Sequence, residues 1–158
     1  MEFGALLLAS LKDIAFLFHE EDIKFCLVGG LAVSMLSTPR ATEDIDMVVA
    51  VDRSFRKKME TVLGKRFTLV QSKDIVEFSF GPIWRLILRR ENEDELVVLD
   101  LLLTETKESK KALEDPIPLN IDGVIVPVAS RKSLIAMKQS SKRPKDLADI
   151  EALQQEPE

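Results

Sequence analysis

The sequence reads Asp44-Ile45-Asp46-Met47-Val48-Val49, in which two acids alternate with apolar residues before a β-branched pair. Such a run favours a strand, and successive side chains of a strand point to opposite faces. We therefore expect Asp44 and Asp46 on one face and Ile45 and Met47 on the other, in the core. Two carboxylates on one face repel each other unless a cation lies between them, and Mg²⁺ prefers oxygen ligands. The segment predicts either a metal site or a pair of solvated acids at a strand end.

A third acid, Asp100, interrupts the most apolar segment of the chain, Leu96–Leu103. A nearly continuous apolar run of this length predicts a central strand. Burying an unpaired ionised carboxylate is very costly, so such a group is paired with a cation or binds metal. Two alternatives follow for Asp100: it is a metal ligand beside the first two acids, or it forms a salt bridge to Arg85 or Arg89 on the neighbouring strand.

A glycine pair, Gly29 and Gly30, lies between the apolar run Ile23–Val28 and a short helical pattern at Leu31–Leu36. Glycine lets the backbone approach a phosphate closely, and the helix start that follows offers unpaired N–H groups to an anion. No Gly-Lys-Ser/Thr follows, and the third glycine of a dinucleotide-binding fingerprint is absent. The pair predicts a phosphate-binding turn or, alternatively, only a tight turn.

The rest of the pattern supports an α+β fold, with a mixed β-sheet and helices packed on it. It predicts helices at 3–19, 52–65, 130–140 and 144–153, strands at 67–70, 75–80, 83–88 and 124–128, and a charged loop at 104–118. Neither an internal repeat nor a domain linker is evident. The length suits one core, so residues 1–158 are expected to form a single domain.

The amino-acid composition argues against several classes of protein. Hydrophobic residues make up 46% of the chain, which is enough for a core, and the net charge of −5 argues against a general nucleic-acid coat or a membrane-surface protein. Residues 131–145 are basic and contain no acid, so this segment could still meet phosphates. Cys26 is the only cysteine, which excludes an intramolecular disulfide. No basic leader precedes the apolar N-terminus and no apolar run approaches the ~20 residues of a membrane span, so a cytoplasmic protein without a membrane partner is expected.

Taken in order, three segments resemble the DNA polymerase β nucleotidyltransferase superfamily: Leu27–Gly30, Asp44–Met47 and Leu99–Leu101. That superfamily has a hydrophobic residue, Gly-Gly or Gly-Ser, a short helix, Asp-X-Asp, and a third carboxylate on a later strand. The second glycine of this chain stands where many relatives have serine. The resemblance therefore implies a nucleotidyltransferase fold whose turn binds phosphate through backbone N–H groups.

Further segments resemble the bacterial AbiEii-like toxin branch of that superfamily. Arg40–Asp46 is similar to its Arg-X-Thr-X-Asp-hydrophobic-Asp run, Leu134–Lys138 to its later lysine motif, and Arg143–Ile150 to its Lys/Arg-Asp helix motif. The resemblance runs in order from about residue 23 to 153. It implies transfer of a nucleoside monophosphate from an NTP to a hydroxyl acceptor.

The resemblance also implies roles for individual residues. Asp44, Asp46 and Asp100 would be the catalytic carboxylates and would bind Mg²⁺ or Mn²⁺, with Asp100 also helping to deprotonate the acceptor hydroxyl. The implied nucleotide-binding residues are Gly29 and Gly30 at the outer phosphates, Lys138 at a phosphate, Arg40, and Asp146, which would orient the basic groups or the nucleotide.

Three of these residues have a plainer alternative. Lys138 shares a helix face with Lys142 and could belong to a solvated basic face. Asp146 lies in the first turn of a predicted helix, where the helix dipole favours an acid without any function. Arg40 could serve simply to neutralise the neighbouring acids, without binding a nucleotide.

Several functions remain open at this level. The acceptor is RNA or tRNA, a protein, or a small molecule as in antibiotic-modifying relatives; alternatively the chain is a non-catalytic module that binds a nucleotide or a partner such as an antitoxin. Many relatives carry a further helical domain, whereas this chain stops soon after the last motif. We therefore expect either a small acceptor or a surface supplied by a homodimer or another partner. Nucleic-acid binding through residues 131–145 alone is unattractive, because the chain is acidic and has no tyrosine for stacking.

Overall fold

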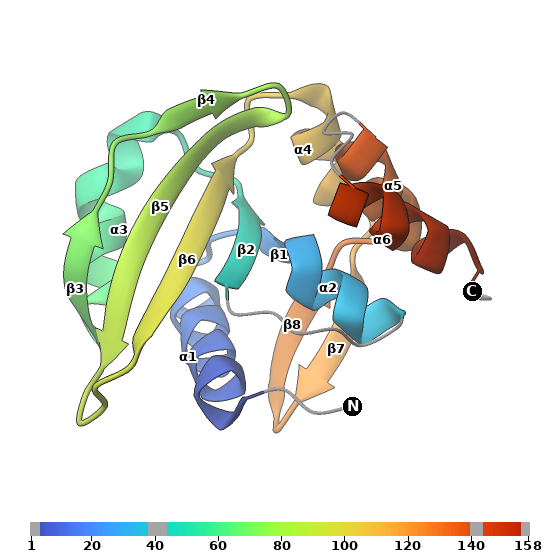
Figure 1. Cartoon of the computed structure of the whole chain (residues 1–158). Coiled ribbons are helices and arrows are strands. Elements are labelled where there is room, and N and C mark those ends of the chain that lie inside the picture. The colour runs from blue at the N-terminus through green and yellow to red at the C-terminus, as the bar shows by residue number, and fades with distance from the viewer. Residues whose placement is uncertain (1–3, 38–43, 140–143, 156–158) are drawn as a thin grey trace.

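The computed structural model describes residues 4–37, 44–139 and 144–155. These residues form one mixed sheet of eight strands in the order β3-β5-β6-β2-β1-β8-β7, with β4 pairing with β5 outside this row (Figure 1). The strands are β1 (Phe25–Val28), β2 (Asp44–Val49), β3 (Phe67–Ser72), β4 (Val76–Phe78), β5 (Gly81–Arg90), β6 (Leu96–Leu103), β7 (Ile117–Ile121) and β8 (Val124–Val128). The helices are α1 (Ala5–Glu20), α2 (Gly29–Leu36), η1 (Arg53–Phe55, a 3₁₀ turn), α3 (Arg56–Leu63), α4 (Lys107–Ala112), α5 (Arg131–Gln139) and α6 (Pro144–Gln155). The predicted α+β class is confirmed.

The most apolar strands occupy the middle of the sheet. β2 runs parallel to β6 and antiparallel to β1. The predicted alternation along β2 is confirmed, because Ile45 and Met47 are fully buried whereas Asp44 and Asp46 are half-buried. β6 has the same arrangement, with Leu99 and Leu101 fully buried. The central strands therefore direct their acids to the face opposite these core side chains.

Helices lie in two groups about the sheet. α1 presents Leu11, Ile14 and Phe18 to the core at the predicted helical spacing. It packs against β8 and β2 of the sheet and against α3. α2 contacts α5 and α6 as well as the central strands β1 and β2. Figure 1 shows α5 and α6 on the same side of the molecule as α2, with α4 between them and the end of the β4–β5 hairpin. This grouping brings the C-terminal helices to the glycine pair that starts α2.

The prediction of a loop at residues 104–118 is wrong, because this segment contains α4 and the start of β7. Thr106 caps α4, its side chain accepting the Ser109 N–H while the Ser109 hydroxyl accepts the Thr106 N–H. Ser109 and Ala112 are fully buried, and Ile117 begins β7. Hydrophobic periodicity does not detect this short helix, because its buried face consists only of Ser109 and Ala112 and its other residues are charged.

Candidate active site

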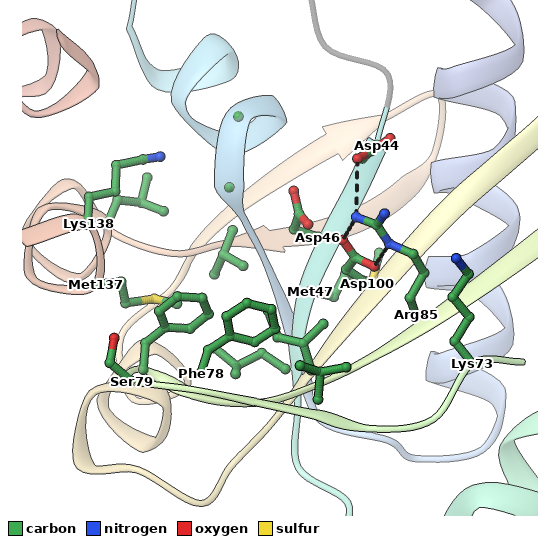
Figure 2. Close-up of a pocket in the computed structure, with 18 of the residues that line it drawn as sticks. Asp44, Asp46, Met47, Lys73, Phe78, Ser79, Arg85, Asp100, Met137 and Lys138 are labelled. Atoms are coloured by element: carbon green, nitrogen blue, oxygen red, sulfur yellow. Dashed lines mark hydrogen bonds and ion pairs between the residues drawn. The ribbon is translucent and has the colours of Figure 1, made fainter. Parts of the chain in front are cut away.

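A cavity of about 680 Å³ opens between the start of α2, the β4–β5 hairpin and α5 (Figure 2). Six of the eight predicted site residues line it: Gly29, Gly30, Asp44, Asp46, Asp100 and Lys138. Arg40 lies outside the described residues, and the side chain of Asp146 does too. The fold thus brings together residues that lie more than a hundred positions apart in the chain.

The three carboxylates lie on two adjacent strands. Asp46 and Asp100 are register partners in the parallel pairing of β2 with β6, so their side chains are neighbours on one face. Asp44 lies two residues before Asp46 and shares that face. Asp100 is 8% exposed, the most buried of the three. Strand pairing alone therefore concentrates three negative charges at one wall of the cavity.

Arg85 compensates part of this charge. Its guanidinium donates two hydrogen bonds to Asp100, Nε to Oδ1 and Nη2 to Oδ2, each at 2.8 Å. Nη2 also lies 3.7 Å from Oδ2 of Asp44. The salt bridge considered for Asp100 is therefore present, and Arg85 rather than Arg89 forms it. The proximity of these carboxylates raises the pKa of Arg85 further, so it stays charged.

Among the arginines that the structure describes, none forms a comparable pair of hydrogen bonds with Asp46. Burial, the charges of Asp100 and Asp44, and a hydrogen bond with Asp100 raise the pKa of Asp46 to about 7, while the charge of Lys138 opposes this rise. A raised carboxyl pKa of this kind reflects burial together with nearby negative charge, both of which disfavour the ionised form. A divalent cation would offset that negative charge.

The donor set suits Mg²⁺ or Mn²⁺ in part. Among the described residues, no three His, Cys, Asp or Glu side chains converge closely enough to hold an ion by themselves. Mg²⁺ commonly binds through one or two carboxylates plus substrate phosphates, with water completing its shell. Asp44 and Asp46 meet that requirement, whereas both oxygens of Asp100 are engaged by Arg85.

Gly29 is the point where the glycine turn contacts the acids. Its φ is +72°, a left-handed conformation that other residues rarely adopt, and a Cβ built on it would lie 2.3 Å from Oδ2 of Asp46. Val28 and Asp46 are register partners of the antiparallel β1–β2 pair, which explains this closeness. The backbone that begins α2 is thus packed against the carboxylate, and only glycine permits it.

Lys138 enters the cavity from α5 and is held by a residue that the sequence did not single out. Its Nζ lies 3.0 Å from Oδ2 of Asp149 on α6, and the two side chains are 11% and 6% exposed. A signal for Asp149 existed: it lies four residues before the buried Leu153 and so places an acid on the apolar stripe of α6.

The sequence also did not indicate the apolar wall of the cavity. Val76, Phe78 and Phe80 line it from the β4–β5 hairpin, and Met137 lines it from α5. Figure 2 shows Phe78, Ser79 and Met137 on one side of the carboxylates and Arg85 and Lys73 on the other. Exposed aromatic residues in a short edge strand carry no periodic signal, which is why sequence reasoning missed them.

In the parts of the chain that the structure describes, no helix is both long enough and apolar enough to cross a bilayer.

Comparison with known proteins agrees with this geometry. An antigenic nucleotidyltransferase-like protein from Paracoccidioides brasiliensis matches with a TM-score of 0.64 and 22% identity over 93% of this chain and 74% of its own. A lincomycin-bound lincosamide antibiotic adenylyltransferase matches with a TM-score of 0.57 and 18% identity over 93% of this chain and 96% of its own. At these identities the likeness concerns the fold. No curated protein matches the sequence significantly.

The sequence profile of one family covers most of the chain. The family is described as "Nucleotidyl transferase AbiEii toxin, Type IV TA system", and its profile matches residues 14–158. That span includes β1, the glycine turn, all three carboxylates and the Lys138–Asp149 pair. The chain belongs to the AbiEii nucleotidyltransferase toxin family.

Proposed function

We propose that this nucleotidyltransferase depends on a divalent metal and transfers NMP from an NTP to a hydroxyl of RNA, tRNA or a protein. The observation that carries the proposal is the contact between Gly29 and Asp46, which joins a phosphate-binding turn to a carboxylate pair. We propose the whole of residues 1–158 as one catalytic domain. An enzyme with these substrates acts in the cytoplasm, where NTPs and tRNA are found.

The phosphates are proposed to bind between α2 and α5. The start of α2 supplies backbone N–H groups from Gly29 and Gly30, and Lys138 supplies a positive charge across the cavity. Asp149 keeps the Lys138 ammonium in place, because both side chains are nearly buried. Arg40 and Asp146 remain proposed nucleotide-binding residues on the strength of the family resemblance.

In the reaction, the acceptor hydroxyl oxygen attacks the α-phosphorus of the NTP and forms a new P–O bond. The bond from the α-phosphorus to the bridging oxygen breaks, and pyrophosphate leaves with the electron pair. Arg85 keeps Asp100 ionised and oriented, and each Asp100 oxygen retains a lone pair beyond its bond to Arg85. We assign to Asp100 the acceptance of the hydroxyl proton, on the side of the acids where Arg85 lies.

Asp44 and Asp46 are the residues proposed to hold Mg²⁺ or Mn²⁺, with Asp100 as a third ligand in competition with Arg85, which bonds both of its oxygens. A metal bound there supplies charge neutralisation at the phosphates and stabilises the developing charge on attacking and leaving oxygens.

Two classes of acceptor are candidates, a macromolecule and a small molecule. The family's description as a toxin favours RNA or protein, and it also suggests an antitoxin as a partner. A small-molecule acceptor is the second candidate, because the chain shares its fold with a lincosamide antibiotic adenylyltransferase over 96% of that enzyme's length. A homodimer is a further arrangement in which a second copy would complete the acceptor surface.

Thermal stability tests the nucleotide site without knowledge of the acceptor. Each NTP is added with and without Mg²⁺ or Mn²⁺ to the wild type, to Asp46→Asn and to the control Asp94→Asn, which changes an exposed loop residue. A ligand at ~100 times its Kd adds ~2.7 kcal/mol, a shift of roughly 5–10 °C for a domain of this size. We expect a metal-dependent shift in the wild type and the control and none in Asp46→Asn. Equal shifts in all three proteins contradict the site.

Label transfer then identifies the acceptor. The protein is incubated with α-³²P-labelled NTP and total tRNA, with cell protein, or with aminoglycoside and lincosamide antibiotics. Label on tRNA or protein supports the toxin-like enzyme, and label on an antibiotic supports the second candidate. Nucleotide binding without any label transfer supports the non-catalytic module.

A further inference from the structure

Two phenyl rings are stacked at the tip of the β4–β5 hairpin. The ring centroids of Phe78 and Phe80 lie 5.4 Å apart, and the ring planes differ by 10°. Phe78 is 48% exposed although it lines the cavity, and Val76 on the same strand is 52% exposed. An exposed apolar surface that lines a cavity with convergent polar groups is typical of a ligand-binding wall.

The hairpin tip is held from both sides. The Thr106 hydroxyl donates a hydrogen bond of 3.0 Å to the Phe80 carbonyl. Arg53 bonds both Glu77, which precedes Phe78, and Glu105 in the segment after β6. A rigid support of this kind lowers the conformational entropy that the hairpin itself loses when a ligand binds, so the exposed ring is suited to be a fixed platform.

The cavity has a charged side and an apolar side. Met137 and Lys138 are consecutive on α5, so the apolar wall adjoins the cation proposed for the phosphates. Figure 2 shows the carboxylates between the group of Phe78, Ser79 and Met137 and the group of Arg85 and Lys73. A nucleotide has the same division, with a flat aromatic base at one end and a charged triphosphate at the other.

We propose that Phe78, supported by Phe80, is the stacking platform for the base of the NTP, with Met137 as an apolar contact at the same subsite. This inference rests on the proposed function, because it assigns one end of the same cavity. Every base has a π-face, so a phenyl platform binds all four bases and discriminates little between them. The acceptor then enters on the opposite side of the acids, beside Arg85 and Lys73.

Binding to two probes tests the assignment. Calorimetry with Mg²⁺ measures the Kd of each of the four NTPs and of inorganic tripolyphosphate, which has the charge but no base. The proteins are the wild type, Phe78→Ala, Phe78→Leu and the control Phe16→Ala, which removes a 37% exposed ring on α1. Base stacking is worth about 1–3 kcal/mol, which corresponds to roughly a 5- to 150-fold change in Kd.

We expect Phe78→Ala to weaken every NTP by this factor and to leave tripolyphosphate unchanged, with Phe16→Ala like the wild type. Phe78→Leu keeps much of the apolar area and the fold but has no ring, so it should lie between the two. Unchanged NTP affinity in both Phe78 variants overturns the platform while the proposed function stands. Equal loss of NTP and tripolyphosphate overturns it as well, since the ring then acts only on the structure. A wild type that binds neither probe refutes the proposed function and the platform together.

Discussion

Arg85 and Asp100 face each other across the antiparallel β5–β6 pair and are joined by two hydrogen bonds of 2.8 Å. The acid in the most apolar strand of the protein is therefore balanced by a cation on the next strand. The same guanidinium lies 3.7 Å from Asp44, while Asp46 keeps a raised pKa. One arginine thus compensates part of the negative charge of this cluster, and the proposed metal would add further positive charge there.

Replacing Arg85 tests this balance. We expect Arg85→Ala to lower the free energy of unfolding of the metal-free protein by about 1–3 kcal/mol, below the value for a fully buried pair because Arg85 is 44% exposed. Added Mn²⁺ should stabilise this variant more than the wild type, since Asp100 becomes available as a ligand. Urea unfolding with EDTA and with Mn²⁺ measures both effects. Arg89→Ala, on the same strand and exposed, is the control; an identical response of the two variants contradicts the prediction.

Asp46 predicts a pH dependence of stability. Its pKa rises from 3.8 to about 7 on folding. Between these values the folded state binds more protons than the unfolded state, so the free energy of unfolding falls as pH rises. We expect Asp46→Asn to remove this fall and to be more stable than the wild type at pH 8 in EDTA, by on the order of 2 kcal/mol. Urea unfolding at pH 5 and pH 8 measures it, with Asp94→Asn as the control, and parallel pH curves for wild type and Asp46→Asn would rule it out.

We expect Gly29 and Gly30 to differ in how well they tolerate replacement by alanine. Gly29→Ala meets both an unfavourable φ and the Asp46 carboxylate, so we expect a loss of more than ~2 kcal/mol of stability and of metal-dependent NTP binding. Gly30 has no positive φ and lies within α2, so Gly30→Ala should fold with near wild-type stability. Thermal unfolding and NTP titration compare the pair. Equal tolerance at both positions means that Gly29 is not required beside Asp46.

The Lys138–Asp149 pair separates a structural role from a binding role. Lys138→Met leaves the buried Asp149 without its lysine, and we expect a loss of about 3 kcal/mol. The double variant Lys138→Met, Asp149→Leu replaces the pair by apolar groups and should recover most of the stability. NTP affinity should remain low in the double variant, because the cation proposed to bind phosphate is gone. Recovery of NTP affinity together with stability would show that Lys138 only holds α5 to α6.

Several features could be predicted from the sequence alone because they depend on local patterns. The acids of β2 and the apolar residues between them alternate by the geometry of a strand, and Asp100 stands out because a carboxylate in an apolar run needs a counterion or metal. The glycine pair marks the strand-to-helix turn. Helix α4 was not predicted from hydrophobic periodicity, because its buried face consists of two small residues, Ser109 and Ala112, whose burial depends on how α4 packs in the fold.

The partners of these residues were decided by the tertiary structure. β5 and β6 are neighbours in sequence, which made Arg85 and Arg89 both reasonable for Asp100, but only the strand register selects Arg85. Gly29 lies against Asp46 because β1 pairs with β2, and Lys138 meets Asp149 because α5 packs on α6. The aromatic wall likewise depends on a hairpin turn that directs Phe78 toward α5. Residue types and spacing determined which groups carry charge and where the glycine turn lies. Strand register and helix packing, which depend on the whole core, determined which of these groups contact one another.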